Sequence, residues 1–156
     1  MLAANTGTLD KALQVVQVNR QQLSLFAGDD VYTPKTLQVT GELAEGMVLA
    51  IPWHIRDNPD AEFAQVAKKL WKGEVNWRTA MAYDAAIALI TAIERSPTRL
   101  GVQKTLSNPN FSTPGACDQI RFFPSGDRLK LIELVKIQPS DLHSFSYEFT
   151  PIVSER

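Results

Sequence analysis

Two adjacent carboxylates, Asp29 and Asp30, are the side chains of this chain best placed to do chemistry. They follow an apolar run at residues 23–27 and the turn residue Gly28. An apolar run of this length is typical of a buried parallel strand. In an open α/β sheet, ligands bind just outside the carboxyl ends of the strands. The pattern therefore places the two acids where such a fold binds its ligand, in position to attract a positively charged group.

Local structure offers an alternative explanation for these acids, because a carboxylate near the start of a helix stabilises that helix. However, Thr33 and Pro34 already occupy the N-cap and first helical positions of the next expected helix. The cap therefore has a residue of its own. This favours a binding role for Asp30, with helix capping as the competing explanation.

The other reactive side chains match no catalytic or metal-binding pattern. His54 has no second histidine at metal-ligand spacing, since His143 is far away in the sequence. Cys117 is the single cysteine, which excludes an intramolecular disulfide and any metal site built on several thiolates. The sequence also lacks a serine nucleophile motif, a glycine-rich phosphate loop and HExxH. We therefore predict a binding protein without cofactor or metal, with a small α/β enzyme using Asp29, Asp30 and His54 as the alternative.

The composition fits about one globular domain, with 156 residues, 44% of them hydrophobic and 21% charged. The net charge of −1 argues against nucleic acid as a partner. No apolar run approaches the roughly 20 residues of a membrane span. Residues 1–7 lack the length and charged flank of a signal peptide. Residues 2–4 are typical of the end of a strand, so we expect the chain to be part of a longer protein.

Strand and helix signals alternate along the first half of the chain, which predicts an α/β fold with a parallel sheet flanked by helices. Periodicity predicts helices at residues 9–20, 34–40, 60–72, 77–95 and 98–106, and strands at 23–27, 47–51, 119–123 and 129–137. The helix at 77–95 is apolar almost all round, so we expect it to be largely buried. The turn at 124–127 predicts a hairpin between the last two strands. Residues 108–115 are predicted as a loop and residues 140–156 as a tail without regular structure.

Four sequence stretches carry a resemblance to a known family. They are FAGDD at residues 26–30, GELAEGMV at 41–48, AYDAA at 82–86, and IRF and GDR at 120–128. In this order they resemble the carboxyl-terminal portion of type I periplasmic-binding proteins, which bind branched-chain amino acids and related solutes for ABC transporters. The resemblance implies two α/β lobes joined by three hinge strands, with the solute held between them.

The resemblance also implies a division of the chain into segments. Residues 1–55 would belong to the second lobe and residues 56–110 would supply helices of the first lobe. Residues 111–139 would form a hinge crossing and the closing hairpin of the second lobe. Residues 140–156 would be a C-terminal tail.

The family's binding site implies roles for several side chains. Asp30 aligns with the acidic residue that binds the ammonium group of an amino-acid ligand. Asn5 and Thr6 follow the first strand on the same sheet edge, although a plain turn explains them more simply. Tyr32 would line the cleft, and Tyr83 would pack beneath it. Trp77 and Arg78 open the helix where the family places a ligand-facing aromatic, although a core tryptophan and a surface charge are the alternatives.

The resemblance implies that the protein captures a small polar solute, an amino acid, and delivers it to a membrane permease of an ABC transporter. The location would be periplasmic or otherwise extracytoplasmic. The alternative is a ligand-sensing domain of a signalling protein. Helices of one lobe beside strands of the other would expose large apolar surfaces, which monomers avoid. We therefore expect a homodimer or a swapped assembly.

Overall fold

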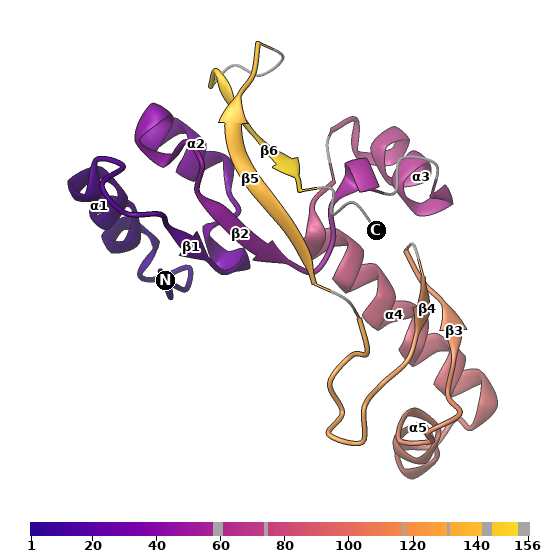
Figure 1. Cartoon of the computed structure of the whole chain (residues 1–156). Helices are drawn as coiled ribbons and strands as arrows, with labels where there is room; N and C mark the ends of the chain where they lie inside the picture. Colours follow the sequence, from indigo (N-terminus) through magenta and orange to yellow (C-terminus); the bar gives the residue numbers. More distant parts are fainter. Residues whose placement is uncertain (58–60, 74, 117, 131, 142–144, 153–156) are drawn as a thin grey trace. The chain divides into compact units, whose positions relative to one another are not determined.

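The chain folds into two compact units. The computed structural model describes residues 1–57, 61–73, 75–116, 118–130, 132–141 and 145–152 (Figure 1). Unit 1 comprises Met1–Ile51 and Ile132–Arg156, and unit 2 comprises Pro52–Leu131. The chain therefore leaves unit 1 once and returns to it once.

Unit 1 contains a four-stranded sheet in the order β1-β2-β5-β6 (Figure 1). Its strands are β1 (Phe26–Ala27), β2 (Val48–Ile51), β5 (Glu133–Pro139) and β6 (Tyr147–Pro151). β1 and β2 run parallel, whereas β5 runs antiparallel to both β2 and β6. The predicted α/β class is thus confirmed, and the sheet is mixed.

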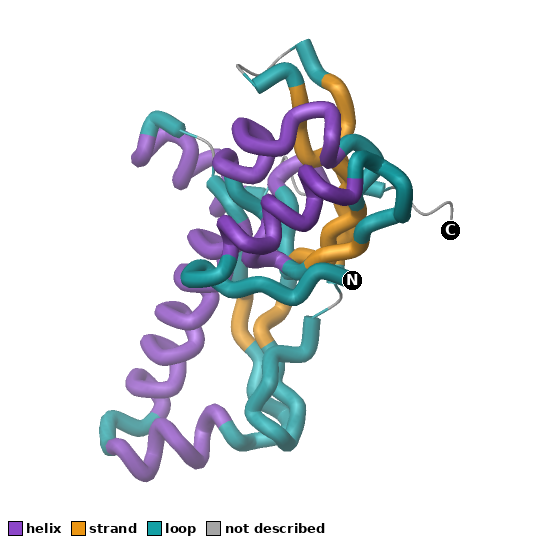
Figure 2. The backbone as a smooth tube through the Cα atoms, turned by 90° about the vertical axis from the view of Figure 1, so that its left-hand side faces the viewer, coloured by secondary structure: helices purple, strands orange, loops and turns teal. Residues whose placement is uncertain are grey.

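Two helices, α1 (Leu9–Asn19) and α2 (Pro34–Thr40), lie on the same side of this sheet (Figure 2). The buried side chains of α1 recur at helical spacing, as the sequence predicts: Leu9, Ala12, Leu13 and Val16. Short 3-10 helices, η1 (Asp29–Val31) and η2 (Gly41–Ala44), precede and follow α2. Gly41 ends α2 with a φ of 49°, a conformation that glycine adopts without a steric cost.

Side-chain alternation sets the packed face of the sheet. In β5, Val135 and Ile137 are fully buried, whereas Leu134, the residue before Val135, is 41% exposed. Leu49 and Ile51 of β2 are fully buried as well. These side chains form a continuous apolar layer, because β2 and β5 pair with Leu49 opposite Val135.

Unit 2 is mostly helical. It contains α3 (Glu62–Trp71), α4 (Trp77–Arg95) and α5 (Arg99–Leu106), with a two-stranded sheet of β3 (Thr113–Pro114) and β4 (Gln119–Ile120). A 3-10 helix, η3 (Ile55–Asp57), precedes α3. No helix in the described part of the chain has both the length and the apolar character that a membrane crossing requires.

The prediction for α4 is right in its bounds and wrong in its burial. Asn76 fixes its start, because the Asn76 side-chain oxygen accepts the backbone N–H groups of Arg78 at 3.0 Å and Thr79 at 3.4 Å. One face is buried, formed by Ala80, Asp84, Ala88 and Ala92. The opposite face is apolar and exposed, so the all-round apolar pattern marks a helix with a second, uncovered face.

The helix α3 buries only some of its apolar side chains. Phe63 and Ala67 are buried, but Val66 and Leu70 are 56% and 68% exposed. Ala64 takes part in the buried face instead. The helix therefore buries a narrower stripe than its apolar residues suggest.

Two predictions for the last part of the chain are wrong: the strands of the final hairpin pair with other partners, and the predicted tail contains a strand. The turn at 124–127 forms, with Phe122 bridging Arg128, but β4 pairs with β3, which lies in the predicted loop. β5 pairs instead with β2 and β6. β6 lies within the predicted tail, where the alternation of Tyr147 and Phe149 was a strand signal. Long-range pairing, which local patterns do not encode, decides both outcomes.

We expect Leu49→Ala in β2 to lower the free energy of unfolding by about 2–5 kcal/mol, because it opens a cavity in the apolar layer. Leu134→Ala is the matched control on the adjacent strand, and it should cost about 1 kcal/mol or less because this side chain is partly exposed. Urea unfolding followed by circular dichroism measures both. Equal losses for the two variants would contradict the assigned face of the sheet.

Candidate ligand-binding site

The carboxyl edge of the parallel strands in unit 1 brings two polar segments to one side of the sheet. Leu2 forms a parallel bridge with Ala27, and its backbone N–H donates to Phe26 O at 2.7 Å. Because the pairing is parallel, the segments that follow Leu2 and Ala27 leave the sheet at the same edge. These segments carry Asn5 and Thr6 in one case and Asp29 and Asp30 in the other.

The turn that carries the two acids is well fixed by backbone hydrogen bonds. The Val31 N–H donates to Gly28 O at 3.2 Å, and the Tyr32 N–H donates to Asp29 O at 3.1 Å. Val31 is 1% exposed and anchors the turn in the core, whereas Asp29 and Asp30 are half-buried. The turn thus holds two carboxylates near the surface on a buried base.

A buried threonine of α2 stabilises this turn by a hydrogen bond to its last residue. Thr36 is fully buried, and its hydroxyl donates to Val31 O at 2.6 Å. The Thr33 hydroxyl accepts the Thr36 N–H at 3.2 Å and so caps α2. Because Thr33 is the cap and Asp29 and Asp30 belong to the preceding turn, the alternative that these acids cap α2 is wrong.

The neighbouring candidates at this edge have structural contacts of their own. The Asn5 side-chain oxygen accepts the Thr8 N–H and the Thr8 hydroxyl, both at 3.1 Å. Asn5 therefore stabilises a local turn, while Thr6 is exposed beside it. The Tyr32 ring packs against Phe149 with ring centres 4.2 Å apart. A ligand role for all three stays a prediction.

Trp77 and Arg78 lie in unit 2, at the start of α4. The Arg78 guanidinium carbon lies 4.3 Å from the centre of the Trp77 ring, a cation–π arrangement. Trp77 is half-buried and also packs against an apolar cluster of unit 2, whose buried members are Trp53, Phe63, Ala64, Ala67, Val75, Ala80 and Ala116. Trp77 therefore contributes to the core, and its ligand role stays a prediction like that of Arg78.

A buried ion pair fixes α4 to the loop that carries Ala116. The Asp84 side chain is 3% exposed; one of its oxygens accepts the Ala116 N–H at 2.6 Å and the other pairs with Arg128. Arg128 also pairs with Asp118 at 2.5 Å, and Lys130 reaches the same carboxylate at 3.2 Å. Burial raises the pKa of the Asp84 carboxyl, although the Ala116 N–H and the Arg128 guanidinium act in the opposite direction.

The remaining reactive candidates show no catalytic or metal-binding arrangement in the described residues. His54 is 4% exposed, and its Nδ1 accepts the Arg56 N–H at 3.2 Å. Among the described residues no group of three histidine, cysteine or acidic side chains could hold a metal ion. Tyr83 is 40% exposed and stacks on Phe63 with ring centres 4.7 Å apart. Cys117 and His143 lie outside the described residues.

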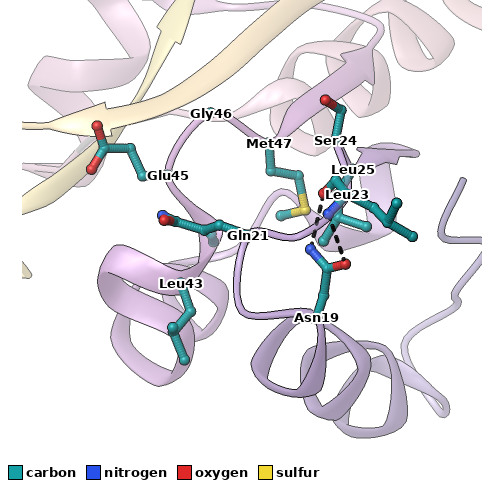
Figure 3. Close-up of a pocket in the computed structure, with 10 residues that line it drawn as sticks. Asn19, Gln21, Leu23, Ser24, Leu25, Leu43, Glu45, Gly46 and Met47 are labelled. Atoms are coloured by element: carbon teal, nitrogen blue, oxygen red, sulfur yellow. Dashed lines mark hydrogen bonds between the residues drawn. The ribbon is translucent and has the colours of Figure 1, made fainter.

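A shallow pocket of about 140 Å³ lies at the opposite edge of the unit 1 sheet (Figure 3). Its lining comes from the segments that precede β1 and β2: Asn19, Gln21, Leu23, Ser24, Leu25, Leu43, Ala44, Glu45, Gly46 and Met47. In the close-up, the Asn19 amide is directed back to its own turn, where it donates to Leu23 O and accepts the Leu23 N–H. The pocket is therefore distinct from the edge that carries Asp30.

Sequence reasoning missed two residues with structural roles: Thr36, which supports the turn with Asp29 and Asp30, and Asp84, which ties α4 to the Ala116 loop. Thr36 reads as an ordinary residue of an amphipathic helix, and only the buried bond to Val31 O reveals its role. The position of Asp84 among apolar residues did indicate a paired side chain, because an acidic side chain is almost never fully buried without a partner. The partner itself, Arg128, is distant in the sequence and could not be predicted from local patterns.

No protein-family model matches the sequence, and no curated protein matches it either. Solved structures do match. A leucine-binding protein from Thermotoga maritima has a TM-score of 0.73 at 23% identity, covering 98% of this chain and 43% of that one. A leucine-, isoleucine-, valine-, threonine- and alanine-binding protein from Brucella ovis has a TM-score of 0.72 at 13% identity, covering 91% and 39%.

A third similar structure is a solute-binding protein of an ABC transporter from Rhodopseudomonas palustris, in complex with p-hydroxybenzoic acid. Its TM-score is 0.72 at 16% identity, covering 97% of this chain and 43% of that chain. The similar structures are thus substrate-binding proteins of the type I periplasmic-binding fold, and this chain has the fold of part of them. It spans less than half of their length.

We expect Thr36→Val to lower the free energy of unfolding by about 0.5–1.5 kcal/mol. It removes the hydroxyl bond to Val31 O at nearly unchanged side-chain volume, while the Thr33 N–H still donates to that oxygen at 2.9 Å. Thr6→Val, at an exposed position, is the control and should change stability by about 0.5 kcal/mol or less. Denaturant unfolding compares the two. A neutral Thr36→Val would show that this bond does not hold the turn.

We expect Asp84→Ala to destabilise the chain by about 3–5 kcal/mol, because it leaves the Arg128 guanidinium without its buried partner. The double variant Asp84→Leu with Arg128→Met should recover part of this loss, since it removes both charges. Asp127→Ala, in an exposed turn, is the control and should cost about 1 kcal/mol or less. Additive losses at Asp84 and Arg128 would contradict the pairing.

Proposed function

We propose that this chain is part of a solute-binding component of an ABC-type transport system, and that its ligand is an amino acid. The observation that carries the proposal is Asp30, a half-buried carboxylate on a fixed turn at the carboxyl edge of parallel strands, in a fold shared with substrate-binding proteins. Such proteins bind without chemistry, so the proposal includes no enzymatic activity.

Charge is the physical reason to favour an amino acid. Its ammonium group needs a fixed anion when a closing cleft removes water, because an unpaired buried charge is very costly. A charge-assisted hydrogen bond to a carboxylate is roughly twice as strong as a neutral one. Asp30 supplies that anion, and Asn5, Thr6 and Tyr32 belong to the surroundings of the same edge.

An aromatic acid is the second candidate ligand, because one similar structure holds p-hydroxybenzoic acid. Such a ligand has a carboxylate and no ammonium group. A carboxylate at the site would repel it, since like charges at close range disfavour each other. The pair of acids at 29 and 30 therefore supports the amino acid over the aromatic acid.

In the proposed mechanism, Asp30 in unit 1 binds the ammonium group of the ligand, and Trp77 and Arg78 in unit 2 stay candidate ligand contacts. A ligand that binds the closed state more tightly shifts the population toward it, which is the general basis of domain closure. A membrane permease would then receive the solute outside the cytoplasm. A ligand-sensing domain would use the same capture step.

Calorimetric titration of the chain with L-leucine, L-valine, L-isoleucine and p-hydroxybenzoate tests the proposal. We expect binding of at least one amino acid and a weakening of roughly 10- to 100-fold in Asp30→Asn, which keeps the size of the side chain and removes its charge. The matched control is Asp127→Asn, whose carboxylate lies in the exposed turn of unit 2. Its affinity should equal that of the unchanged chain.

Two outcomes would overturn the proposal. Binding of p-hydroxybenzoate alone, unaffected by Asp30→Asn, would move the ligand class to aromatic acids. Equal affinities of Asp30→Asn and Asp127→Asn for an amino acid would remove Asp30 from the site.

A further inference from the structure

The outer strand β6 contributes one buried side chain, which lies against the turn that carries Asp30. Of the five residues of β6, Phe149 alone is buried. The centre of its ring lies 4.2 Å from the centre of the Tyr32 ring, and the two planes are tilted by 33°. β1 and β6 are the outer strands of the four-stranded sheet in unit 1 (Figure 1). The turn that follows β1 therefore contacts the strand at the other end of the sheet.

Tyr32 is the residue that closes this turn. It is the C-terminal cap of η1, and its backbone N–H donates to Asp29 O at 3.1 Å. An aromatic side chain has few rotatable bonds, so a packed ring leaves its own backbone little freedom. A contact that fixes the Tyr32 ring therefore also fixes the backbone of the turn, and with it the position of Asp30.

The core of the sheet holds Phe149 in place. Phe149 pairs with Ile137 across the β5–β6 ladder, and Ile137 is fully buried. The position of the Phe149 ring therefore depends on the pairing of β6 with β5. The residue after β6 reports this pairing, because the Ile152 N–H donates to Leu134 O at 2.8 Å. A chain of contacts thus leads from β5 through Phe149 to Tyr32.

We propose that Phe149 is a positioning residue for the turn that carries Asp30, so that the pairing of β6 with β5 raises the affinity of this turn for its ligand. The inference rests on the proposed function, in which Asp30 binds the ammonium group of an amino acid. Phe149 acts through Tyr32. The coupling is reciprocal, so a bound ligand must in turn stabilise the pairing of β6 with β5. An aromatic pair of this kind changes an equilibrium constant by about 2- to 10-fold.

Amide hydrogen exchange of the unliganded chain, followed by NMR, tests the positioning step. Phe149→Leu keeps an apolar side chain and removes the ring, so the Tyr32 N–H should exchange about 2- to 10-fold faster. The Val48 N–H, which donates to Leu25 O at 3.1 Å, is the internal control for opening of the sheet and should change less. Thr150→Ala, at the half-buried next position of β6, should leave the Tyr32 N–H unchanged. Equal acceleration at Val48 and Tyr32, or no acceleration at Tyr32, would overturn the proposal.

Titration with L-leucine, L-valine and L-isoleucine tests the coupling to the ligand. Phe149→Leu should weaken binding by about 2- to 10-fold, and it should have no further effect in a Tyr32→Leu background, because the two changes remove the same contact. The bound amino acid should slow exchange of the Ile152 N–H in the unchanged chain. A full effect of Phe149→Leu in the Tyr32→Leu background, or unchanged Ile152 exchange, would overturn the proposal.

A failure of the proposed function would look different. If none of the three amino acids binds the unchanged chain, the assignment of the ligand is wrong. The Tyr32 exchange rates of the unliganded variants still decide whether Phe149 positions the turn.

Discussion

The parallel pairing of β1 with β2, extended by the bridge from Leu2 to Ala27, is the constraint on which the candidate site depends. Parallel strands must end at the same edge, so the turns that follow them meet there whatever their own sequences. The core then fixes the turn after β1, through the burial of Val31 and the hydroxyl bond from Thr36. The carboxylates at the surface are therefore held by an apolar base.

In each of the two compact units, buried interactions fix the position of a loop or turn, but the kind of interaction differs. In unit 1, buried apolar side chains and one buried hydroxyl hold the edge. In unit 2, the Asp84–Arg128 ion pair ties α4 to the Ala116 loop, although burial makes the charge costly. Such a pair adds little net stability, and its value lies in fixing one arrangement of helix and loop.

Local sequence patterns predicted what local forces decide. The starts of α2 and α4 follow from local residues: Thr33 and Asn76 cap the first turns with their side chains, and Pro34 occupies the first helical position of α2. A strand at the position of β5 was predicted, but its pairing with β2 and β6 was not, because local patterns do not encode pairing between residues distant in sequence. The strand β6 was missed despite the alternation of Tyr147 and Phe149. The position of Asp30 at the sheet edge was predictable from the strand–glycine–acid order, whereas its support by Thr36 was not.

The central claim is that the carboxyl edge of the unit 1 sheet binds the ammonium group of an amino acid. The most direct measurement is an NMR titration of the ¹⁵N-labelled chain with L-leucine, followed through the backbone amide signals. The account predicts that the largest shifts fall on residues 28–32, and that Asp30→Asn needs a roughly 10- to 100-fold higher concentration of L-leucine to reach them. Shifts centred on Gly46 and Met47 at the opposite edge, or shifts at residues 28–32 with the same concentration dependence in Asp30→Asn, would contradict it.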